Sequence, residues 1–157
     1  FSLSSIILVL INSQKDKQFQ IKSNLFNAIV IDRLNEILSF INHLHKLVMS
    51  KDLNTAFQNN DKGYILLLYD DIQKRCENFI SDYVFTLHLY SSKLPEEIET
   101  LLDNFQTNLI LLIANYSKQN QNEIKFFYIE YSQIREEFLK SLRELLKSFA
   151  PSAKTYK

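Results

Sequence analysis

Apolar residues recur along this chain in alternating steps of three and four positions, the spacing that keeps one face of an α-helix turned toward its neighbours. Four segments show this pattern. Their apolar positions are Val30, Leu34, Ile37, Ile41, Leu44 and Val48 in the first segment, Ile65, Tyr69, Ile72, Cys76, Phe79, Tyr83, Leu87 and Tyr90 in the second, Ile98, Leu102, Phe105, Leu109, Leu112 and Tyr116 in the third, and Ile124, Phe127, Tyr131, Ile134, Phe138, Leu142, Leu145 and Phe149 in the fourth, with Ile21, Leu25 and Ala28 extending the first segment upstream. The pattern predicts four amphipathic helices.

Residues that favour turns and helix ends separate these segments. Asp61 precedes Gly63 and is placed to cap the second helix, Pro95 fits the first turn of the third, and Pro151 follows the fourth. We therefore expect helices near residues 3–50, 63–91, 95–118 and 121–149.

Glycine is scarce, with one in 157 residues, and this disfavours sheet folds whose tight turns need positive φ. Long helices with short connections predict an all-α fold, an antiparallel four-helix bundle with an elongated N-terminal helix. About 30 Å of that first helix should project beyond the others. We expect the following residues to be buried at mid-bundle: Leu34, Ile37, Ile41, Ile72, Cys76, Phe79, Leu102, Phe105, Ile134 and Phe138.

The first eleven residues carry no charge and no polar face, which sets residues 1–14 apart from a bundle at 15–150 and a polar tail at 151–157. Three interpretations remain open. The segment is the end of a transmembrane helix that begins upstream of Phe1, or a surface for self-association or a docked helix, or the core of a signal peptide. Lys15, Lys17 and Lys22 follow it, as on the cytoplasmic flank of a span. The residues predicted to contact the membrane are Ile6, Ile7, Leu8, Val9, Leu10 and Ile11.

Charge and cysteine content restrict the partners. The chain has 18 Lys and Arg against 18 Asp and Glu, so its net charge is zero and nucleic acid is not expected as a partner. The single cysteine cannot form an internal disulfide, which mildly favours a reducing compartment.

The spacing of reactive side chains predicts no catalytic, metal or cofactor site. None of His43, His45 and His88 follows a glutamate by three positions, as the ligands of helical metal centres do. Cys76 lies on an apolar face, where a buried structural thiol is expected. Asp70 and Asp71 precede Lys74 and Arg75 by four positions, which predicts surface ion pairs. Five tyrosines on or near the apolar faces could line a small-molecule pocket: Tyr69, Tyr83, Tyr90, Tyr116 and Tyr131.

Three stretches are apolar nearly all round the helix: 65–69, 109–114 and 126–129. In an antiparallel bundle all three fall at the end farthest from Phe1. A helix that serves one core needs only an apolar stripe, so the extra residues indicate a second interface. Its predicted members are Leu67, Leu111, Phe126 and Ile129. The alternative is that residues 53–57 fold over this end and bury it.

These patterns together predict a non-enzymatic interaction or assembly module that binds a protein partner or itself. Its N-terminal side is expected at a membrane, with the bundle on the cytoplasmic side. The alternative function is a ligand-sensing bundle with a small-molecule pocket between helices. The two differ in one respect, because a sensor needs a polar pocket lined by several tyrosines, whereas an assembly module needs a dry core and an apolar outer patch.

Overall fold

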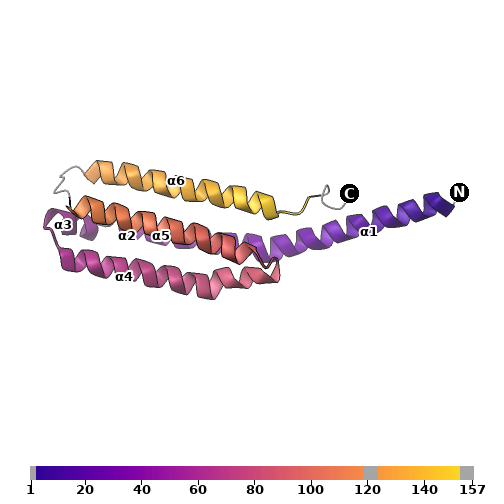
Figure 1. Ribbon diagram of the computed structural model, residues 1–157, viewed down its shortest axis with the longest axis horizontal. Helices are drawn as coiled ribbons and strands as arrows, with labels where there is room; N and C mark the ends of the chain where they lie inside the picture. The colour runs from indigo at the N-terminus through magenta and orange to yellow at the C-terminus, as the bar shows by residue number, and fades with distance from the viewer. Residues whose placement is uncertain (1–2, 119–123, 153–157) are drawn as a thin grey trace.

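A computed structural model describes residues 3–118 and 124–152, and these residues form a helical bundle without any strand. The first helix is a continuous rod made of α1 (Leu3–Leu25), a π-helical segment η1 (Phe26–Ile31) and α2 (Asp32–Val48). Figure 1 shows α1 running well beyond the ends of the other helices, as the sequence predicts.

The second helix of the bundle follows a short extra helix. This short helix, α3 (Lys51–Gln58), begins at Ser50, whose hydroxyl accepts the Leu53 N–H at 3.2 Å. The next helix, α4 (Lys62–Phe79), is capped as expected by Asp61, whose carboxylate accepts the Tyr64 N–H at 3.1 Å. It continues through a second π-helical segment, η2 (Ile80–Val84), into a 3₁₀ segment, η3 (Phe85–Leu89).

The last two helices are α5 (Leu94–Lys118) and α6 (Ile124–Phe149). Two features favour the start of α5, a proline in its first turn and the carboxylates of Glu96 and Glu97, which complement the positive end of the helix dipole. Residues 121–123, which we expected in the last helix, lie outside the described part of the chain.

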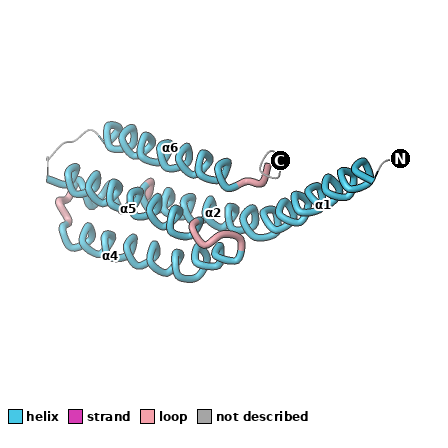
Figure 2. Tube along the Cα trace, turned by 45° about the vertical axis from the view of Figure 1, so that its right-hand side comes forward, coloured by secondary structure: helices cyan, strands magenta, loops and turns pink. Residues whose placement is uncertain are grey.

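Contacts between side chains define how the helices lie next to one another. Phe40 of α2 stacks on Phe79 of α4 with ring centroids 4.4 Å apart, while His43, farther along α2, meets Arg75, farther back on α4. These two helices therefore run in opposite directions. Helix α5 packs against both α4 and α6, as the views in Figures 1 and 2 agree.

The core of the bundle is formed largely by the predicted apolar faces. Eight of the ten residues that we expected at mid-bundle are buried, from Ile37 on α2 to Phe138 on α6. Leu34 and Ile134 are instead half-buried and pack against the edge of the core. Both predictions of full burial were wrong because these two positions lie where the apolar stripe reaches the border of the packed face.

The apolar stripe expected upstream of Val30 does not face the bundle. Ile21, Leu25 and Ala28 are exposed, whereas Lys22 and Phe26 are half-buried. The cause is the π-helical segment η1, because i→i+5 hydrogen bonding adds a residue to a turn and rotates the preceding helix relative to the core. The first helix also ends at Val48, and the second at Leu89, each within two residues of the prediction.

Candidate interaction surfaces

The four apolar side chains predicted to form a second interface are exposed to solvent at one end of the bundle. This distal end is where α3 lies, where α4 and α6 begin and where α5 ends (Figure 1). Leu67 of α4 is 71% exposed and Leu111 of α5 is 53% exposed. On α6, Phe126 is 56% and Ile129 is 52% exposed. We call these four residues, all predicted from the sequence, the distal apolar surface.

Helix α3 covers the core at the distal end but leaves the distal apolar surface uncovered. Leu53 and Ala56 of α3 are buried. The Phe57 ring lies edge-on to two others, with its centroid 4.7 Å from that of Tyr116 and 5.2 Å from that of Phe127. We had considered that residues 53–57 fold over the distal end and bury it. Helix α3 does bury the core residues beneath it, but it leaves the distal apolar surface exposed.

A cavity of about 510 Å³ opens at the distal end between α3, the start of α4 and the end of α5. Of the five tyrosines that we considered as pocket residues, only Tyr69 lines it. Tyr69 is half-buried, and this burial raises the pKa of its hydroxyl above the usual value of 10.0. The lining residues are Ala56, Phe57, Asn60, Asp61, Lys62, Ile65, Leu66, Tyr69, Ser117 and Lys118.

The apolar segment of α1 is exposed on every side. Its six predicted membrane residues, from Ile6 to Ile11, are between 43% and 66% exposed, with no buried face among them. Lys15 and Lys17 follow within two turns. None of the described helices combines the length and the apolar character that crossing a bilayer requires.

Tyr90 joins the base of α1 to the other end of the chain. The Lys22 ammonium donates to the Tyr90 carbonyl at 3.2 Å and lies 4.1 Å from the centre of its ring. Phe26 packs edge-on against the same ring at 5.3 Å. The Tyr90 hydroxyl donates to the Phe149 carbonyl at 2.7 Å, at the end of α6. The first helix is thereby fixed to the bundle near Lys22, which leaves about 30 Å of α1 projecting.

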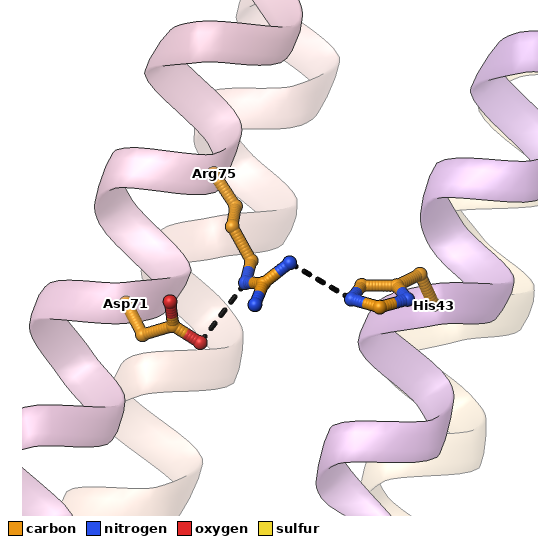
Figure 3. Close-up of polar contacts among 3 residues, drawn as sticks. All are labelled: His43, Asp71 and Arg75. Carbon is orange, nitrogen blue, oxygen red and sulfur yellow. Dashed lines mark hydrogen bonds and ion pairs between the residues drawn. The ribbon is translucent and has the colours of Figure 1, made fainter.

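A polar contact between α2 and α4 is shown in Figure 3. The Arg75 guanidinium donates through Nε to Asp71 Oδ2 at 2.9 Å and through Nη1 to His43 Nε2 at 2.8 Å. Since arginine has no acceptor atom, His43 Nε2 is the acceptor in this contact. Asp71 with Arg75, and Asp70 with Lys74, form the two ion pairs predicted from their spacing. The four side chains are largely exposed, and each carboxylate is paired with a cation. They are therefore explained as surface ion pairs without a reactive site.

His45 makes a second polar contact between helices, on the side of α2 that faces α6. Its Nδ1 lies 3.3 Å from the hydroxyl of Tyr131, which is buried. Burial, and then the nearby Arg135 guanidinium, lower the pKa of His45 below its usual value of 6.5. Burial also raises the pKa of Tyr131 to about 12. His45 is half-buried because the adjacent helix places the Tyr131 hydroxyl within its reach.

The sole cysteine and the possible metal ligands were considered separately as reactive groups. Cys76 is fully buried, and this burial, followed by the Asp103 and Glu77 carboxylates, raises the pKa of its thiol to about 12. In the described part of the chain, no three His, Cys, Asp or Glu side chains come together in a way that could hold a metal ion.

Two of the five tyrosines considered as pocket residues lie in different surroundings. Tyr83 is exposed, and Tyr116 packs among aromatic rings.

Comparisons with known protein families, with curated proteins and with solved structures found no match to this chain.

Proposed function

We propose that this protein is a non-enzymatic assembly module that associates with itself or with a protein partner through the distal apolar surface. The observation that carries the proposal is the exposure of four large apolar side chains, from three helices, at one end of a bundle whose core is closed. Large apolar side chains gathered at one end of a protein and left in water are typical of interaction sites.

The alternative function, a ligand-sensing bundle, has less support. Such a sensor needs a polar pocket between the helices with several tyrosines in its wall. The cavity at the distal end has one of the five tyrosines, and the described core buries no polar or charged residue other than tyrosine. An apolar core with exposed apolar side chains outside it favours assembly.

We propose further that the N-terminal side of α1 holds the protein at a membrane, with the bundle on the cytoplasmic side. Ile6 to Ile11 present apolar side chains all round the helix, which suits surrounding lipid better than a single partner helix would, since such a partner needs only a stripe. The lysines that follow suit the cytoplasmic headgroup region. Changing Ile7 and Leu10 to Asp should move the full chain from the membrane fraction to the soluble fraction, and an unchanged distribution would refute this part.

The distal apolar surface is tested by changing Phe126 and Ile129 together to Asp. We expect circular dichroism to report unchanged helix content while sedimentation velocity reports loss of the assembled species. The matched control is Phe85→Asp with Leu89→Asp, because these two residues are exposed to a similar extent at the opposite end of the bundle. If the distal variant unfolds, or if both double variants dissociate alike, the distal apolar surface is not the interface.

A further inference from the structure

The cavity at the distal end has an apolar floor and a polar mouth. Its floor is made by buried Ala56 and Ile65 together with Phe57. Phe57 is held in place by the rings of Tyr116 and Phe127, at centroid distances of 4.7 Å and 5.2 Å. This floor therefore rests on packed aromatic side chains of α5 and α6, which gives it a fixed shape.

The mouth of the cavity carries hydroxyl groups and an excess of positive charge. Tyr69 and Ser117, on α4 and α5, contribute hydroxyl groups to its lining, and the Ser117 hydroxyl donates to the Ala114 carbonyl at 2.8 Å. Lys62 and Lys118 are exposed residues of its lining, and among the described lining residues Asp61 carries the one carboxylate. Asp61 already accepts the Tyr64 N–H at 3.1 Å as the cap of α4. The two lysines thus leave a net positive rim above an apolar floor.

We propose that this cavity binds a small monocarboxylate with an apolar body, such as a medium-chain fatty acid. The apolar body occupies the floor over Ala56 and Ile65, and the carboxylate lies at the mouth between Lys62 and Lys118. The volume of about 510 Å³ falls within the range of small-molecule pockets, and a lining that combines apolar side chains with polar groups able to orient a ligand is typical of them. This site is separate from the distal apolar surface and does not depend on the proposed function.

Binding to the full chain is tested with three probes that separate the two halves of the ligand: octanoate, octanol and acetate. Octanoate should give saturable chemical-shift changes in ¹H–¹⁵N spectra at residues of the cavity. Octanol lacks the charge and acetate lacks the apolar body, so both should bind at least tenfold more weakly. Equal affinity for octanol and octanoate, or changes centred on Phe126 and Ile129, would overturn the proposal.

Variants of neighbouring residues provide matched controls. Leu66 lines the cavity whereas Leu67 does not, and both are exposed, so neither substitution should unfold the bundle. Leu66→Gln should weaken octanoate binding about fivefold, and Leu67→Gln should leave it unchanged while weakening self-association.

The charged rim is tested separately. Changing Lys62 and Lys118 together to Gln should weaken octanoate binding about tenfold, as expected for the loss of two exposed charge contacts. Changing the exposed Lys140 and Lys147 of α6 to Gln is the control. Unchanged octanoate affinity in the rim variant would overturn the placement of the carboxylate. If the distal double variant Phe126→Asp with Ile129→Asp assembled as the unmodified chain does while octanoate still bound, the proposed function would fail and this site would stand.

Discussion

The sole cysteine reports directly on how tightly the core is closed. Burial and two carboxylates raise the pKa of the Cys76 thiol from 9.0 to about 12, so its thiolate fraction near neutral pH falls by about a thousandfold. We predict that iodoacetamide at pH 8 leaves the folded protein unmodified for hours and labels it completely in guanidinium. Mass spectrometry measures both. Rapid labelling under native conditions would mean that the core around Ile72 and Phe79 opens readily.

Two residues at the start of α4, Asn60 and Gly63, give opposite predictions for substitution by alanine. Gly63 does not have a positive φ, and a Cβ there would meet only Asp61 Oδ1, at an ordinary 3.6 Å. Asn60 has φ 52°, in the left-handed region. We predict that Gly63→Ala raises the free energy of unfolding by about 0.5–1 kcal/mol, because the unfolded chain loses freedom.

Asn60→Ala should instead lower the free energy of unfolding by about 1 kcal/mol, because alanine tolerates the left-handed region poorly. Asn60→Gly serves as the control, since glycine accepts that conformation without steric cost. Urea unfolding of the three variants measures the differences. Destabilisation by Gly63→Ala would show that the first turn of α4 has another conformation.

At the scale of the elements, the sequence predicts which segments are helical but not where a helix changes its winding. The periodicity and the residues at Asp61 and Pro95 place the main helices within a few positions. The sequence does not reveal η1. A π-helical segment satisfies its backbone hydrogen bonds as an α-helix does, and it has no distinct residue preference here. The side of the first helix that faces the bundle was therefore predicted one position too early. The prediction placed it on Leu25, whereas Phe26, the first residue of η1, packs against the bundle.

The sequence also did not predict which side chains contact one another between helices. His43 with Arg75 and His45 with Tyr131 join segments far apart along the chain. Spacing within a helix predicts partners at i+4, as it did for Asp71 and Arg75, but it carries no information about which helix lies alongside.

The contact between α2 and α6 makes stability depend on pH. Burial and the Arg135 guanidinium lower the pKa of His45 in the folded protein below its usual value of 6.5. Above pH 6.5 the imidazole is neutral in both states. As the pH falls from 6.5 through the lowered value, the unfolded chain binds the proton more readily, and stability is lost.

We predict that His45→Gln reduces the fall in the free energy of unfolding between pH 7.5 and pH 5.0. Urea unfolding at both pH values measures it, with His88→Gln as a control at an exposed site. An identical fall in the wild type and in His45→Gln would contradict this role for His45.

At the scale of the whole molecule, one core runs through the bundle while apolar residues stay exposed at both extremities. The core extends from Val30, near the base of α1, to Phe127 under α3. Ile6 to Ile11 and the distal apolar surface remain uncovered at opposite ends. Chain direction and hydrophobic pattern located both regions in the sequence, because each has more apolar residues than its helix needs for one core. The distal cavity was not foreseen, since its lining comes from α3, α4 and α5 together.

The integrity of this single core is tested at its centre. Phe105 of α5 is buried, and its ring lies 5.2 Å from that of Phe138 on α6. We predict that Phe105→Ala lowers the free energy of unfolding by about 3–5 kcal/mol, through lost burial and the remaining cavity. That loss is a large share of the about 5–15 kcal/mol that stabilises a domain, and it should lower the thermal midpoint by about 10 °C. Calorimetry measures the shift, and Phe85→Ala, at an exposed phenylalanine, should change the midpoint little. If Phe105→Ala left the midpoint unmoved, the core would not be centred on the contact between α5 and α6.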